Sequence, residues 1–91
     1  MKAVKGRFTV LNEKGLHARP STEIVKCASQ YNSEIHLFYS DFIVNAKSIL
    51  GILMMAAARG GQVTVEAVGD DAEEALCALV DLAKRRFNMV Y

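Results

Sequence analysis

Apolar and polar residues alternate along several short segments of the chain. In the first of these segments, Phe8 and Val10 share one side of an extended stretch. A period of two residues is typical of a β-strand that buries one face. The second and third segments are separated only by Ser40 and Asp41, a spacing that predicts a hairpin. The predicted strands are residues 7–11, 34–39, 42–44 and 62–68.

Between the strands, apolar residues recur every three or four positions, which is the helical period. Pro20 suits the first turn of a helix that begins about two residues earlier and ends at residues 32–33. Ser48 is a candidate N-cap of a short helix that runs into the late 50s, before residues 60–61. Asp70 is the predicted N-cap of the last helix. The apolar face of that helix consists of Leu76, Leu79, Val80, Ala83 and Phe87.

The predicted order of elements is therefore βαββαβα. Strands that are apolar on one side only are typical of an antiparallel sheet with one covered face and one face in water. We expect an α/β (α+β) fold, an open-faced β-sandwich in which a four-stranded antiparallel sheet carries three helices on one face. A chain of 91 residues suffices for one such domain, residues 1–91.

Composition and charge argue against several classes of function. Eleven basic and ten acidic residues leave a net charge of +1, too little for a general nucleic-acid or membrane-surface binder. The longest apolar run, residues 49–58, is about half the ~20 residues that a membrane-spanning helix needs. No apolar signal-peptide core follows the first residues. Cys27 and Cys77 lack a Cys-x-x-Cys spacing, so we expect two reduced, buried thiols in a cytoplasmic protein; the alternative is a structural disulfide. With His17 and His36 they show no metal-ligand spacing, and we expect no metal.

The predicted helix after Ser48 is apolar on every side. A two-layer domain cannot bury a helix all round, because nothing lies beyond the helical layer. We therefore expect part of this helix to face water as a docking patch for a partner. The alternative is that the whole run is core, with the short helix held under a loop. The patch residues are Ile49, Leu50, Leu53 and Met54.

The junction at residues 15–20 suggests phosphate chemistry. Because Pro20 lies in the first helical turn, His17 is placed at the N-cap, beside backbone N–H groups that bind phosphate at helix N-termini. The positive helix end disfavours the protonated imidazole and so favours the nucleophilic form. Arg19 can supply a guanidinium to a phosphoryl group. The alternative is a capping histidine beside a solvated arginine.

Two motifs carry a family resemblance. Residues 15–20, GLHARP, and residues 47–54, KSILGILM, fall at the expected places in the βαββαβα order. This pair resembles the HPr family, the histidine-containing phosphocarriers of the bacterial phosphoenolpyruvate-dependent phosphotransferase system. The similarity runs from the first strand to about Phe87. The resemblance implies a phosphoryl-transfer carrier that uses no cofactor and is not a free-standing enzyme.

The resemblance also implies roles for residues. His17 matches the histidine that takes phosphate on Nδ1 from enzyme I and gives it to an enzyme IIA domain in sugar uptake. Arg19 matches the arginine that neutralises the phosphoryl group, and the backbone amides of Ala18 and Arg19 would hold its oxygens. Pro20 has no amide hydrogen to donate.

The second motif implies regulation and docking. Ser48 matches a serine that an ATP-dependent HPr kinase phosphorylates in many members. The alternative role of Ser48 is an ordinary N-cap, and the two roles are compatible. The family docks its partners where this chain has Ile49, Leu50, Leu53 and Met54. The expected partners are enzyme I, enzyme IIA domains, the serine kinase/phosphorylase and regulatory proteins. The protein is expected to be monomeric and to bind neither nucleic acid nor membrane.

Some residues depart from the family pattern. Ala46 stands where glycine or a larger residue is common, and Ala56 and Ala57 replace a common glycine. Residues 53–58 and 73–76 also resemble the nitrogen-related branch, NPr, which passes phosphate into a regulatory relay, whereas Pro20 is more similar to ordinary HPr. Two further alternatives are a regulatory module that acts through phospho-Ser48 and a purely structural interaction domain.

Overall fold

The sheet of this protein has an antiparallel order that brings the first and last strands together. In the computed structural model, which describes residues 2–90, its strands are β1 (Lys2–Thr9), β2 (Glu34–Tyr39), β3 (Phe42–Asn45) and β4 (Gln62–Gly69). Their order in the described part of the chain is β1-β4-β2-β3, and every neighbouring pair is antiparallel. Met1 and Tyr91, the ends of the predicted domain 1–91, lie outside the described residues.

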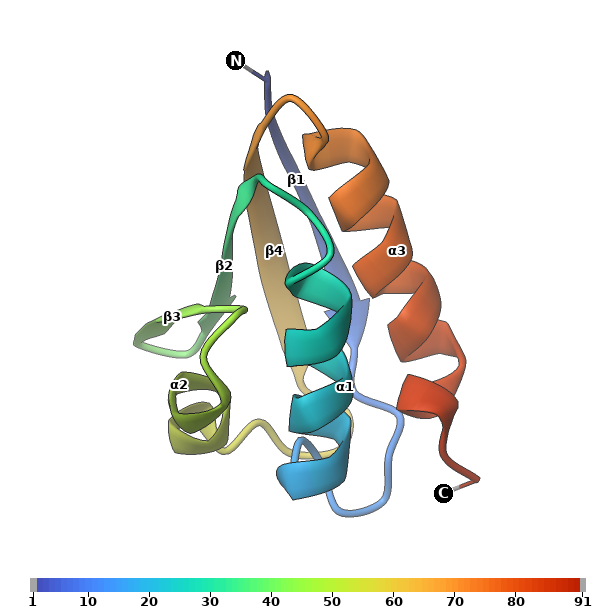
Figure 1. Ribbon diagram of the computed structural model, residues 1–91. Helices are drawn as coiled ribbons and strands as arrows, with labels where there is room; N and C mark the ends of the chain where they lie inside the picture. Colours follow the sequence, from blue (N-terminus) through green and yellow to red (C-terminus); the bar gives the residue numbers. More distant parts are fainter. Residues whose placement is uncertain (1, 91) are drawn as a thin grey trace.

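Three helices lie on one face of this sheet, as Figure 1 shows for the described residues: α1 (Ala18–Ala28), α2 (Ile49–Met55) and α3 (Ala72–Lys84). The other face is open. The core between the layers consists of residues that the alternating and helical patterns place inward, among them Ile24, Ile35, Leu37, Ile52, Val63, Val65 and Leu79. The predicted open-faced sandwich is therefore confirmed.

The first strand begins five residues earlier than the predicted segment 7–11 and ends two residues earlier, at Thr9. β1 pairs with β4 along its whole length, from Lys2 opposite Gly69 to Thr9 opposite Gln62. Its first half lacks buried side chains on both faces, so the alternation that marks a strand is weak there. The pairing partner, which is distant in sequence, sets the length of β1.

The predicted boundaries of all three helices were wrong. α1 ends at Ala28, with Ser29 as its C-cap, and not at residues 32–33. α2 ends at Met55 and not in the late 50s, because Ala56 adopts a left-handed conformation with φ 51° and its N–H donates to the Leu53 carbonyl. The N-cap of α3 is Asp71 and not Asp70. The Asp71 carboxylate accepts hydrogen bonds from the backbone N–H of Asn32 and of Ser33, at 2.8 and 2.9 Å, and from the Ser33 hydroxyl. It therefore joins α3 to the start of β2.

Beyond α3 the chain turns in an unusual way. Phe87 was predicted on the helical face but lies in the short 3-10 turn Arg86–Asn88, whose three residues all have positive φ. Phe87 is fully buried, and its ring packs edge-on against Phe8 with the centroids 5.8 Å apart. The buried Asn12 holds this turn, because its Nδ2 donates to the Arg86 carbonyl at 3.0 Å.

Both cysteines are free thiols in the structure. Cys27 is partly buried, and burial raises the pKa of its thiol. Cys77 is exposed on α3, so the prediction of two buried thiols was wrong for this residue. Between residues 2 and 90, no helix has the length and apolar character needed to cross a membrane.

Candidate functional site

His17 is the N-cap of α1, as predicted. Its backbone is extended, with φ −79° and ψ −166°, and its carbonyl accepts the first helical hydrogen bond, from the Ser21 N–H at 3.1 Å. The imidazole itself makes no capping hydrogen bond to any described residue. The residue is half-buried, so part of it is accessible to solvent. Both ring nitrogens are thus left for chemistry.

Two backbone amides remain open beside this ring. The first N–H groups of a helix have no partner within it, and no other described residue takes those of Ala18 and Arg19. Pro20 has no N–H, and the Ser21 N–H is already bonded to His17. Two donors at the positive end of a helix form a place where phosphate oxygens bind.

Backbone contacts with the loop after α2 hold the loop that carries His17 in place. The Leu16 N–H donates to the Ala57 carbonyl at 2.9 Å. Gly15 has φ +68°, and a Cβ on it would lie 2.3 Å from that same carbonyl oxygen. Only glycine fits such a close approach of two backbones. The Ser21 hydroxyl also donates to the Leu16 carbonyl, at 3.1 Å.

Sequence reasoning missed these supports. Ala57 is an alanine in an apolar run and shows no polar signal, because the contact uses its backbone carbonyl. The sequence pattern also gives no role to Asn12, although its side chain is fully buried three residues before Gly15 and donates to the Arg86 carbonyl. The available signal is the position of Asn12: a polar residue that lies between an alternating strand and a glycine turn can hydrogen-bond to the backbone of another segment.

His17 and Arg19 line two different hollows. The hollow beside His17, about 440 Å³, lies between its loop and the loop after α2. Arg19 is exposed and lines a hollow of about 430 Å³ between α1 and the C-terminal segment that includes Phe87 and Asn88. The guanidinium of Arg19 forms no ion pair with any of residues 2–90, so it is free to turn toward an anion.

The predicted patch residues of α2 are exposed. Leu50 and Met54 have exposed fractions of 66% and 61%, and Ile49 and Leu53 of 42% and 38%. Ile52 and Met55, on the inner side of α2, are buried in the core. The alternative that the whole run is core is therefore wrong.

Ser48 caps α2, as predicted. Its hydroxyl oxygen accepts a hydrogen bond from the Gly51 N–H at 3.1 Å. The residue is half-buried and directly precedes the exposed Ile49 and Leu50. The cap and the exposed apolar surface are thus adjacent.

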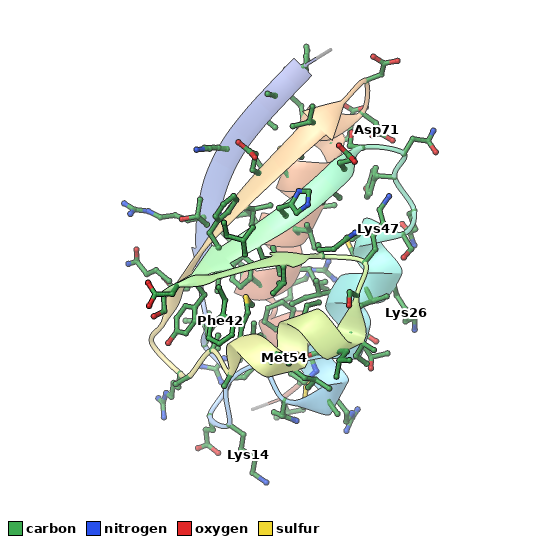
Figure 2. The ribbon with its side chains drawn as sticks, turned by 90° about the vertical axis from the view of Figure 1, so that its left-hand side faces the viewer. Lys14, Lys26, Phe42, Lys47, Met54 and Asp71 are labelled. Atoms are coloured by element: carbon green, nitrogen blue, oxygen red, sulfur yellow. The ribbon has the colours of Figure 1, made fainter. Side chains whose placement is uncertain are left out.

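The His17 loop and α2 lie at the same end of the molecule. Figure 2 shows Lys14, from the loop before α1, and Met54 of α2 toward this end, whereas Asp71 lies at the opposite one. In Figure 1 the start of α1 is likewise at the end of the molecule where α2 lies. A partner that covers α2 would therefore approach His17.

Comparison with known proteins gives the family of this chain. Residues 4–85 match the family described as the PTS HPr component phosphorylation site. The phosphocarrier protein HPr of Neisseria meningitidis serogroup A is 42% identical over 85 residues, which cover 93% of this chain and 96% of that protein.

Solved structures agree with this match. The crystal structure of HPr-C-His from Thermoanaerobacter tengcongensis has a TM-score of 0.88 and 42% identity, with 100% of both chains covered. A structure described as an HPr dimer from the same organism has a TM-score of 0.75 and 45% identity, with 86% of this chain and 90% of that chain covered. This chain belongs to the HPr family of the phosphotransferase system. It is a phosphocarrier protein and not a catalyst, and it works with other proteins of that system.

Proposed function

We propose that His17 takes a phosphoryl group on Nδ1 from phospho-enzyme I, derived from phosphoenolpyruvate, and passes it to enzyme IIA domains for sugar uptake. The observation that supports this most is the position of His17. Its half-exposed ring, free of capping bonds to the described residues, lies at a helix N-terminus beside two unpaired amides. These are the requirements of a group that receives and releases phosphate.

The transfer breaks one bond to phosphorus as it forms another. The bond between phosphorus and its carrier atom on enzyme I breaks while the bond to His17 Nδ1 forms, and a second exchange of the same kind passes the group to the enzyme IIA domain. The N–H groups of Ala18 and Arg19 donate to the phosphoryl oxygens, and the Arg19 guanidinium turns toward them to balance the charge. Positioning and charge stabilisation supply most of what phosphoryl transfer needs.

The exposed α2 residues Ile49, Leu50, Leu53 and Met54 are the proposed docking surface for both partners. Ser48 is the proposed regulatory site for an ATP-dependent kinase. A phosphate there adds a charge of about −1.5 to −2 beside this apolar surface. A partner would have to bury that charge, so phosphorylation of Ser48 is expected to weaken docking.

Phosphorylation with phosphoenolpyruvate and purified enzyme I tests the role of His17. We expect a phosphate that is labile in acid and stable in base, and we expect His17→Ala to abolish it. The matched control is His36→Ala, because His36 is the other histidine and lies in β2, away from the N-terminus of α1. Labelling that persists in His17→Ala, or that disappears in His36→Ala, would contradict the proposal.

A further inference from the structure

The hollow beside His17 has a second wall that sequence reasoning did not assign. One wall is the loop before α1, which brings Glu13, Lys14 and His17 itself. The other wall is the end of α2 and the loop after it, which bring Leu53 and Arg59. The hollow therefore holds two cationic residues besides the histidine, and neither of them is Arg19.

The backbone on both sides of Arg59 is fixed. Two residues before it, the Ala57 carbonyl accepts the hydrogen bond from the Leu16 N–H at 2.9 Å. Directly after it, the Gly60 N–H donates to the Val10 carbonyl at 2.8 Å. Arg59 thus lies in a short segment whose backbone is hydrogen-bonded to Val10, before the His17 loop, and to Leu16, within that loop. The position of its Cα relative to His17 is set by backbone contacts.

The guanidinium of Arg59 is not used elsewhere in the described chain. The residue is exposed, and no ion pair or hydrogen bond links its side chain to residues 2–90. Several other cations on the surface do have carboxylate partners: Lys2, Lys5, Lys26 and Arg85. Arg59 therefore reaches the hollow without first breaking an ion pair.

A phosphoryl group on His17 would need more charge balance than the helix supplies. It brings up to two negative charges, whereas Pro20 leaves only the Ala18 and Arg19 amides at the helix end, and the Arg19 guanidinium adds a single positive charge. Between the two cations in the hollow, an arginine has the planar fork that donates two parallel hydrogen bonds to phosphate oxygens, and Lys14 offers a point charge.

We propose that Arg59 is a second guanidinium contact for the phosphoryl group on His17, made from the loop after α2 and independent of Arg19. This inference rests on the proposed function of His17. It assigns to the 56–59 loop a direct part in holding the transferred group, in addition to its support of the His17 loop.

The equilibrium constant for phosphorylation tests this contact. Enzyme I in catalytic amount equilibrates the protein with phosphoenolpyruvate and pyruvate, and the phosphorylated fraction is measured at fixed ratios of the two. We expect Arg59→Ala to lower the equilibrium constant about three- to fivefold. Arg59→Lys should recover part of this loss. Lys14→Ala is the matched control, since it removes one positive charge from the same hollow, and it should lower the constant less than Arg59→Ala.

An equilibrium constant does not depend on how the protein docks to enzyme I. A slower rate in Arg59→Ala with an unchanged equilibrium constant would therefore assign Arg59 to docking and overturn the inference. Equal effects of Arg59→Ala and Lys14→Ala would overturn it as well, because only the net charge of the hollow would then matter. If the wild-type protein takes no phosphate on His17, the proposed function itself fails, and that result is separate from an unchanged constant in Arg59→Ala alone.

Discussion

The Asp71 carboxylate shows how one side chain can join two distant elements. Hydrogen bonds from the Ser33 hydroxyl and from the backbone N–H of Asn32 and Ser33 hold the pKa of Asp71 below its ordinary value of 3.8. A lowered pKa means that the folded state favours the ionised carboxylate. The resulting stability is present above pH 3.8 and is lost as the pH falls through the lower value of the folded state.

We predict that Asp71→Asn is less stable than the wild type near neutral pH, and that the difference narrows as the pH falls below about 4. Urea unfolding followed by circular dichroism at a series of pH values measures this. Asp41→Asn, in the exposed β2–β3 turn, is the control and should follow the wild type. A stability difference for Asp71→Asn that stays constant with pH would contradict the prediction.

At the same scale, the sequence predicted those residues whose role follows from local chemistry. His17 and Ser48 were assigned as N-caps because helix starts favour particular residues at particular offsets from proline and apolar runs. Asp71 was missed because Asp70 beside it fits a cap equally well in sequence. The choice between them depends on Asn32 and Ser33, which are far away along the chain.

The helix α2 is the element that combines a cap, an apolar inner side and an apolar outer side. We predict that Ser48→Ala lowers the free energy of unfolding by about 1 kcal/mol, because the Gly51 N–H loses its acceptor.

Ser48→Asp should retain most of the stability, since aspartate also caps a helix, but it should slow phosphoryl transfer from enzyme I. Urea unfolding and transfer kinetics measure the two effects. Ser29→Ala, at an exposed serine after α1, is the control for stability. Normal transfer by Ser48→Asp would leave Ser48 as a cap only.

The outer side of α2 gives a second prediction. Leu50→Glu should reduce kcat/KM for transfer from enzyme I about tenfold, because a charge replaces an apolar contact at the proposed docking surface. Ile43→Glu is a matched control: Ile43 is 65% exposed against 66% for Leu50. Its neighbour in β3, Val44, faces Gly51 of α2. Because successive side chains of a strand point to opposite faces of the sheet, Ile43 points away from α2. Circular dichroism should show both variants folded. Equal transfer rates for Leu50→Glu and the wild type would assign Leu50 to structure alone.

For the molecule as a whole, the sequence predicts the sheet and the layer of helices on it, but not how the segment after α3 packs against the core. Alternation and helical period are local signals, and they were enough for the sheet and its helices. Phe87 fits the helical period of α3, yet the chain leaves the helix after Lys84 and buries Phe87 through a left-handed turn. That turn is held by Asn12 and by the Asn88 Nδ2, which donates to Glu23 Oε1 at 3.1 Å. None of these contacts is visible in a local pattern.

Phe87→Ala should lower the free energy of unfolding by about 3–5 kcal/mol, because it leaves a cavity against Phe8. Such a loss is a large part of the total stability of a small domain. Urea unfolding measures it, and Val90→Ala, at a side chain that is 87% exposed, should change stability by less than about 0.5 kcal/mol. A loss below about 1 kcal/mol for Phe87→Ala would mean that the C-terminal turn is not part of the cooperative core.

The shared location of the His17 loop and the outer side of α2 limits how the protein can be used. Under the proposed function, the donor and the acceptor both cover the outer side of α2 when they reach His17, so the two proteins cannot be bound at the same time. Each partner has to dissociate before the next one binds. The two partners would therefore compete for the same protein molecules, and an excess of either one would slow the exchange of phosphate with the other.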